Sequence, residues 1–167
     1  MPEPGGASGG RASQVRTSTV HPDDAGWPAY VGLFADYRAH YGGQREPERC
    51  DRWLREHVGR GRVLCYLATV EDGGGHGKPA AMALVVPSPA SQSLAVFWQL
   101  RDLFVAPAHR RTGVGRAVVT AVADAARSAG ALRLALQTET GNLPAQALYH
   151  GLGFEDVGGY LQMLLTL

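Results

Sequence analysis

The sequence has little lysine and cysteine, and it has no long apolar run. Lys78 is the only lysine, so nearly all of the 16 Lys and Arg residues are arginine, and the formal net charge is +1. A charge so close to neutral does not suggest a protein that binds nucleic acid or a membrane surface. No apolar stretch reaches membrane-spanning length, and the first residues lack the basic and apolar regions of a signal peptide. We therefore expect a cytoplasmic protein without nucleic-acid or membrane partners.

Several catalytic motifs are also missing. Cys50 and Cys65 lack metal-ligand spacing and a secretory context, so we expect two reduced thiols rather than a disulfide or a nucleophile. The six histidines show no pattern that demands a metal, so we expect no metal site. The G-x-S-x-G elbow of hydrolases, the P-loop and the G-x-G-x-x-G dinucleotide turn are absent. These absences exclude the usual serine-hydrolase and nucleotide-binding classes.

The length and composition suit one domain. A chain of 167 residues with 45% apolar content can bury one core and is short for two. Residues 1–13 are mostly Gly, Pro, Ser and Ala, which favour a disordered N-terminal tail. We therefore expect a single domain over residues 14–167.

Hydrophobic periodicity predicts an α/β chain in the order β-α-α-β-β-β-α-β-α-β-β. Helices are expected at residues 24–40, 47–57, 114–128 and 142–150. Strands are expected at residues 15–20, 63–70, 80–86, 93–105, 132–138, near Phe154 and at 160–167. Residues 71–78 read as a long glycine-rich hairpin loop, and residues 87–92 as a further loop.

The most informative segment is residues 110–116, which read RRTGVGR between a predicted strand and a predicted helix. A helix N-terminus presents unpaired N–H groups and the positive end of the helix dipole. Glycines let a phosphate approach this backbone closely. The R-x-x-G-x-G turn therefore indicates a pyrophosphate site, with an arginine-rich, solvated helix start as the alternative reading.

Two motifs in the same order resemble the GNAT superfamily of acetyl-CoA-dependent N-acetyltransferases over residues 97–167. The strand motif D-L-[FY]-V stands at residues 102–105 before the turn, with Pro107 following. The motif N-x-x-A-x-x-L-Y-x-x-x-G-F begins at Asn142 and ends at Phe154. The resemblance implies a mixed sheet of about six to seven strands with about four helices. In this fold the sheet is splayed between its two central strands, where acetyl-CoA is held.

The resemblance also implies where the cofactor binds. The main chain of the strand at residues 103–105 would bind the pantetheine arm, and the N–H groups of the turn would hold the pyrophosphate, with arginines nearby. The implied cofactor-binding residues are Leu103, Phe104, Val105, Arg110, Arg111, Thr112, Gly113, Val114, Gly115, Arg116, Asn142 and Tyr149.

The implied catalytic residues are Tyr149 and Asp102. Tyr149 would act as general acid to the departing thiolate, with a packing role as the alternative; Asn142 also suits a helix N-cap. Gln99 occupies the position where many members carry a glutamate base, and an amide cannot be that base. Asp102 remains as the group that holds the substrate ammonium or relays its proton, with a structural salt bridge to Arg101 or another arginine as an equal alternative.

The acceptor side is expected on the first two helices. Tyr37 and Tyr41, together with Asp102, are the predicted substrate-binding residues, and His40 and Glu46 lie nearby. The resemblance implies acetyl transfer to the primary amine of a small molecule by direct attack in a ternary complex. Acetylation of a protein N-terminus or an aminoacyl-tRNA is one alternative, and a non-catalytic acetyl-CoA sensor is another. Residues 160–167 are a candidate homodimer surface.

Overall fold

The computed structural model describes residues 14–71, 77–159 and 161–167. The chain divides into a larger unit that ends at Gln137 and a smaller unit, Thr138–Leu167, and each is described by itself. The expected tail at residues 1–13 and the tip of the glycine-rich loop lie outside the described residues. The expectation of a single domain stays a prediction.

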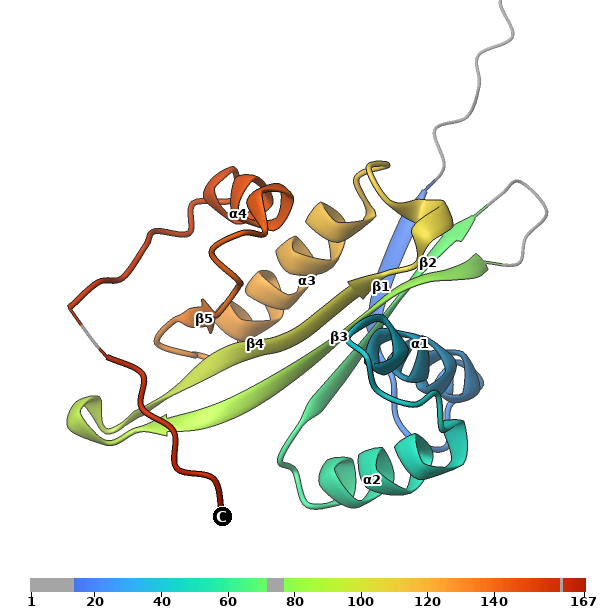
Figure 1. The fold of residues 1–167 in the computed structure, drawn as a ribbon, viewed down its shortest axis with the longest axis horizontal. Helices are drawn as coiled ribbons and strands as arrows, with labels where there is room; N and C mark the ends of the chain where they lie inside the picture. Colours follow the sequence, from blue (N-terminus) through green and yellow to red (C-terminus); the bar gives the residue numbers. More distant parts are fainter. Residues whose placement is uncertain (1–13, 72–76, 160) are drawn as a thin grey trace, which may run out of the picture. The chain divides into compact units, whose positions relative to one another are not determined.

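The larger unit contains a five-stranded mixed sheet in the order β1-β2-β3-β4-β5 (Figure 1). The strands are β1 (Val15–Thr19), β2 (Leu64–Glu71), β3 (Gly77–Ala90), β4 (Ala95–Val105) and β5 (Leu134–Leu136). The first four strands pair antiparallel, whereas β4 and β5 pair parallel. The mixed α/β class and the order of elements up to the last helix are confirmed.

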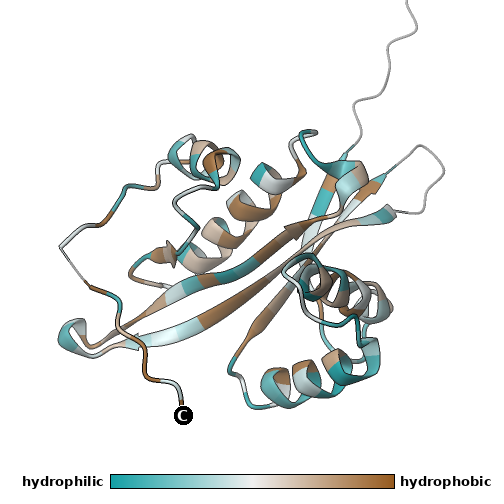
Figure 2. Cartoon of the chain, in the orientation of Figure 1, coloured by the Kyte–Doolittle hydropathy of each residue, from teal (hydrophilic) through white to brown (hydrophobic). Residues whose placement is uncertain are grey.

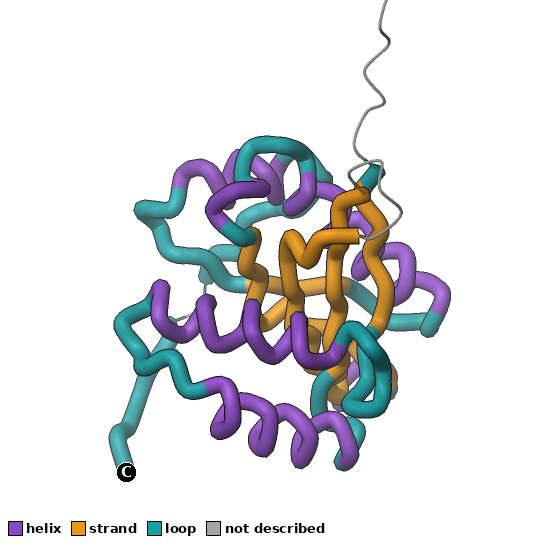
Figure 3. Tube along the Cα trace, turned by 90° about the vertical axis from the view of Figure 1, so that its right-hand side faces the viewer, coloured by secondary structure: helices purple, strands orange, loops and turns teal. Residues whose placement is uncertain are grey.

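Helices cover both faces of this sheet. Helices α1 (Trp27–His40) and α2 (Pro47–Gly59) lie side by side on one face, and α3 (Val114–Ser128) lies on the other (Figures 1 and 3). Apolar residues follow the central strands (Figure 2), and burying them against the helices forms the core. Fully buried side chains include Tyr30 and Leu54 on one face and Val118 and Val122 on the other.

Helix α1 begins at Trp27, later than the expected residue 24. Asp24 instead closes a turn, because its Oδ2 accepts a hydrogen bond from the His21 N–H at 2.7 Å. Pro28 then occupies the first turn of the helix, where its missing N–H costs nothing.

Strand β3 extends through Pro87 and Pro89, where a loop was expected. The pairing of β2 with β3 begins at Leu64 opposite Val85, so β3 has only β4 as its neighbour beyond that point. Prolines are tolerated in such an edge segment because one side of the strand needs no donors. The connection to β4 is a short 3-10 turn, Ser91–Ser93.

The smaller unit contains helix α4 (Leu143–His150), and its cap was predicted correctly. The Ala145 N–H donates to Asn142 Oδ1 at 3.3 Å, so Asn142 is the N-cap. At the C-terminal end of the helix, the ring of Tyr149 makes an edge contact with the ring of Phe154, with centroids 5.7 Å apart.

The strands expected near Phe154 and at residues 160–167 are wrong for the residues that the structure describes. Neither residues 154–159 nor 161–167 form a strand, and the sheet has five strands rather than about six to seven. A strand needs a hydrogen-bonded neighbour, and alternating apolar residues alone do not supply one. Leu161, Met163 and Leu165 accordingly remain exposed.

Two smaller expectations can be compared with the structure. Cys50 and Cys65 are both free, as predicted, and both are buried; burial raises the pKa of the Cys65 thiol to about 11. In the described part of the chain, no helix is long and apolar enough to cross a membrane.

Candidate active site

The candidate site is organised by a β-bulge at Arg101. Leu100 lies opposite Val85 and Asp102 lies opposite the adjacent Leu84, so Arg101 is the extra residue of β4. A bulge of this kind shifts the alternation of side chains by one position. Residues that face each other across a ladder share a face of the sheet, and Leu84 belongs to the core under α1. The bulge therefore turns Asp102 toward α1.

Asp102 meets Tyr37 of α1 on that face. The Tyr37 hydroxyl donates to Asp102 Oδ1 at 2.6 Å, and Asp102 Oδ2 has no hydrogen bond to any described residue. Burial raises the pKa of Asp102, although the bond from Tyr37 and the charge of Arg101 both oppose this rise. Burial and the bond to Asp102 raise the pKa of Tyr37, which stays a hydroxyl donor. The pair presents one free carboxylate oxygen.

Aromatic rings surround this pair. The Tyr37 ring has centroid distances of 5.1 Å to Tyr41 and 6.3 Å to Phe104, and it also contacts Phe34 at 6.1 Å. His40 packs against Tyr41 and Phe104 at 5.2 and 6.0 Å. We call these five residues, Phe34, Tyr37, His40, Tyr41 and Phe104, the aromatic wall. Tyr41 is 58% exposed, so the wall is accessible at this end.

Beyond Leu100, the second edge of β4 is open within the described part of the larger unit. The parallel ladder with β5 pairs only Trp98, Gln99 and Leu100, although β4 continues to Val105. The Ala106 N–H donates to Ala80 O on the β3 side at 2.9 Å. Because the peptide bond is trans, the Val105 carbonyl points the opposite way, toward the open edge.

Arg110 folds back onto this edge. Its Nε donates to the Val105 carbonyl at 3.1 Å, and its guanidinium carbon lies 5.7 Å from the centroid of the Phe104 ring. Arg110 is one of three arginines, with Arg111 and Arg116, that could reach the phosphates, and in the structure its side chain joins the turn to the end of β4. Arg110 therefore links the turn to the aromatic wall through Phe104.

The turn between β4 and α3 has the backbone of an anion site. Arg111 and Gly113 both have positive φ, 62° and 88°, and the Thr112 hydroxyl donates to the His109 carbonyl at 2.7 Å. Gly113 is the N-cap of α3 without a side-chain cap, and the first helical bond runs from the Ala117 N–H to Gly113 O. A Cβ on Gly113 would meet nothing within 4 Å. The residues after Gly113 therefore direct main-chain N–H groups toward open space.

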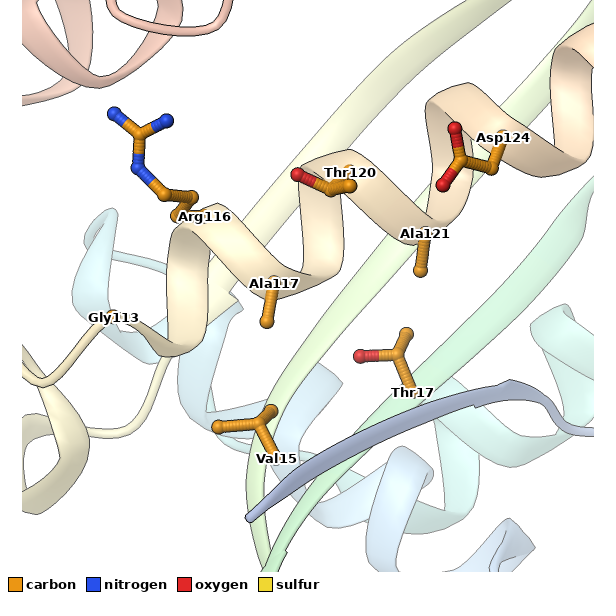
Figure 4. Close-up of a pocket in the computed structure, with 8 residues that line it drawn as sticks. All are labelled: Val15, Thr17, Gly113, Arg116, Ala117, Thr120, Ala121 and Asp124. Atoms are coloured by element: carbon orange, nitrogen blue, oxygen red, sulfur yellow. The ribbon is translucent and has the colours of Figure 1, made fainter. Parts of the chain in front are cut away.

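A hollow of about 470 Å³ follows the flank of α3 that faces β1 (Figure 4). It is lined by Val15, Thr17, Gly113, Arg116, Ala117, Thr120, Ala121 and Asp124. The hollow shares only Gly113 and Arg116 with the turn. It extends the accessible surface of the turn along α3.

The structure brings some predicted residues together and leaves others apart. Tyr37, Tyr41 and Asp102 form one cluster, and the alternative reading, a salt bridge from Asp102 to Arg101 or another arginine, is not found among the described residues. Glu46 is held instead by Arg38 and Arg49 at 3.4 and 3.3 Å, so it is a structural ion pair. The expected roles of Asn142 and Tyr149, which belong to the smaller unit, stay predictions.

Sequence reasoning missed the bulge and the Tyr37–Asp102 bond. It also missed the ring contacts of Phe34, although the three- and four-residue spacing of Phe34, Tyr37 and Tyr41 signals neighbouring rings on a helix. The bulge has no comparable signal in the residues around Arg101.

The mixed sheet, with β4 unpaired on one side beyond Leu100 in the described part of the larger unit and a glycine-rich helix start after it, fits an acetyl-transferring enzyme. The model of the acetyltransferase (GNAT) family matches residues 27–154, and the chain belongs to this family of N-acetyltransferases. The chain is 28% identical over 138 residues to an uncharacterized N-acetyltransferase, YhfO, of Bacillus subtilis (strain 168), covering 83% of this chain and 89% of that protein.

Two further matches extend this finding. Streptothricin acetyltransferase of Streptomyces lavendulae is 38% identical over 85 residues, which cover 51% of this chain and 43% of that enzyme. The crystal structure of a probable acetyltransferase superposes with a TM-score of 0.79 at 25% identity, covering 92% of this chain and 97% of the other.

Proposed function

We propose that the protein transfers an acetyl group from acetyl-CoA to the primary amine of a small molecule, by direct attack in a ternary complex. The observation that carries this proposal is the arrangement around β4. Its open edge continues directly into the turn at the start of α3, while the Asp102 side chain of the same strand points toward the aromatic wall. The two reactants would thus meet at one strand. The streptothricin acetyltransferase relative supports a small-molecule acceptor.

The residues of the cofactor side fit the group that the family uses. Alternation along β4 directs the main-chain N–H and C=O groups of Leu103 and Val105 to the open edge, where an extended amide-bearing arm finds partners. The N–H groups of Val114, Gly115 and Arg116 suit a pyrophosphate. Acetyl-CoA supplies the activated acetyl group and a thiolate leaving group. A main-chain N–H near Val105 would polarise the acetyl carbonyl.

Asp102 would receive the amine. Most primary amines are protonated at neutral pH, and only the neutral form is a nucleophile. Asp102 Oδ2 can accept a hydrogen bond from the ammonium and take its proton directly or through water, while Tyr37 holds Oδ1. The raised pKa of Asp102 makes it a stronger base than an exposed aspartate. As the N–C bond forms, the C–S bond breaks, and Tyr149 would give a proton to the thiolate.

The test is calorimetric titration with acetyl-CoA, followed by thiol release in the same preparation against a panel of primary amines and matched tertiary amines. We expect binding, and release with primary amines only. No binding would overturn the cofactor assignment. Mass spectrometry of the product places the acetyl group on nitrogen.

A non-catalytic acetyl-CoA sensor is the second candidate, and Gln99 favours it. Gln99 lies opposite Val86 on the α1 face of β4, the same face as Asp102, and it carries no acid there. Binding of acetyl-CoA without thiol release for every amine would establish the sensor.

A further inference from the structure

We propose that the acceptor carries a carboxylate beside its primary amine, with Arg101 binding the carboxylate and Asp102 binding the ammonium. This inference rests on the proposed acetyl transfer and narrows its substrate class to amino-acid-like molecules.

The bulge is the geometric basis. In a regular strand, neighbouring residues point to opposite faces, whereas the bulge inserts Arg101 directly before Asp102 without a partner on β3. Burial raises the pKa of both Asp102 and Tyr37, and the charge of Arg101 opposes both rises, so its guanidinium lies within electrostatic reach of the pair. A cation and an anion thus stand together at the site.

Arg101 is also available to bind a ligand. It is exposed, and the ion pairs of the described residues do not include it. Many other arginines of the described chain are paired, for example Arg45 with Asp36 at 2.6 Å and Arg55 with Asp51 at 2.9 Å. The planar guanidinium binds carboxylates through two parallel hydrogen bonds. A substrate carboxylate would give Arg101 the partner that the chain does not supply.

The charges around the site disfavour a polycation. Asp102 is the one carboxylate of the cluster formed by Tyr37, Tyr41 and Asp102, while Arg101 contributes a positive charge beside it. Glu46, the nearby acid on the acceptor side, is already held by two arginines. A second ammonium on the substrate would meet excess positive charge, whereas a carboxylate would balance it.

The experiment measures thiol release with three molecules that share one side chain: phenylalanine, its amide and phenethylamine. We expect kcat/KM at least about ten-fold higher for phenylalanine than for the other two. The amide has the least basic amine of the three, so a preference driven only by amine pKa would favour the amide instead. The same comparison with lysine and 1,5-diaminopentane tests a side chain that carries a second amine.

Arg101→Gln should remove most of this preference by lowering kcat/KM for the carboxylated amine about ten-fold, with little change for phenethylamine. Arg101→Lys should retain part of it. Arg127→Gln, at a surface ion pair at the end of α3, is the matched control and should change neither value.

The outcomes separate the two claims. Equal kcat/KM for the acid, the amide and the amine, or a preference unchanged in Arg101→Gln, overturns the carboxylate inference and leaves amine acetylation intact. The absence of release with every amine overturns the proposed function, and the carboxylate inference fails with it.

Discussion

The open edge of β4 and its α1 face are built in different ways. On the edge, the groups that suit the cofactor are main-chain N–H and C=O groups, at Leu103 and Val105 and at the start of α3. On the α1 face, the groups that suit the acceptor are side chains, chiefly Asp102, Tyr37 and Arg101. Main-chain groups are the same in every sequence, so the edge suits one cofactor shared by a family. The side chains can change without altering the fold, so they suit a particular acceptor.

The largest expected effect concerns the side chains on the α1 face of β4. Asp102→Asn should lower kcat/KM about 100-fold or more, because the amide cannot take the proton of the ammonium. Acetyl-CoA affinity, measured by calorimetry, should stay within about two-fold of the parent value, since Asp102 is not expected to touch the cofactor.

Tyr37→Phe is the matched control for Asp102→Asn. It leaves the carboxylate but removes a hydrogen bond that lowers the pKa of Asp102. We expect a smaller loss of turnover and an acidic limb of the pH–rate profile shifted to higher pH. An unshifted limb, or full turnover in Asp102→Asn, would remove Asp102 from proton transfer.

Gly113→Val tests the main-chain N–H groups at the start of α3. A β-branched residue is strained at the φ of 88°, and its side chain would enter the open space beside the first N–H groups of α3. We expect acetyl-CoA binding to weaken by about ten-fold or more in calorimetry. Gly59→Ala, in helix α2 with no atom within 4 Å of the added Cβ, is the control and should bind normally. Normal binding by Gly113→Val would overturn the pyrophosphate assignment.

Features set by local sequence patterns were predictable from the sequence, whereas features set by strand register were not. The turn at residues 110–116 and the span of α3 were predictable because glycine spacing and helical periodicity act locally. The meeting of Tyr37 with Asp102 depends on the bulge at Arg101, which arises from the register between two strands and has no local pattern. The strands expected after α4 failed for a related reason, because alternation does not specify a pairing partner.

Tyr149→Phe tests whether the smaller unit contributes to chemistry. We expect turnover to fall about ten-fold, because the thiolate would leave without a general acid, while acetyl-CoA affinity is unchanged. The ring contact with Phe154 should survive the substitution, so the melting temperature is the control for folding. Unchanged turnover would return Tyr149 to a packing role.

The smallest expected effect concerns stability, and it separates an acid held for function from one held for structure. Burial raises the pKa of Asp102 above its ordinary 3.8, so the folded protein holds this proton more tightly than the unfolded chain. Ionising Asp102 therefore costs folding free energy as pH rises above about 4. Asp102→Asn avoids that cost. The melting temperature of the variant minus that of the parent should therefore increase as pH rises from about 4 to 7.

Asp51 should show the opposite sign. Burial tends to raise its pKa, but hydrogen bonds from Trp27 Nε1 at 2.6 Å and Arg55 Nε at 2.9 Å outweigh burial and lower it. The ionised Asp51 therefore stabilises the fold above its unfolded pKa, and this contribution is lost as pH falls. Asp51→Asn should melt below the parent at pH 7, and the difference should shrink only as pH falls below about 4. The melting temperatures of both variants, relative to the parent, could instead change in the same direction with pH. In that case Asp102 is a structural acid like Asp51, and the α1 face of β4 has no acid held for function.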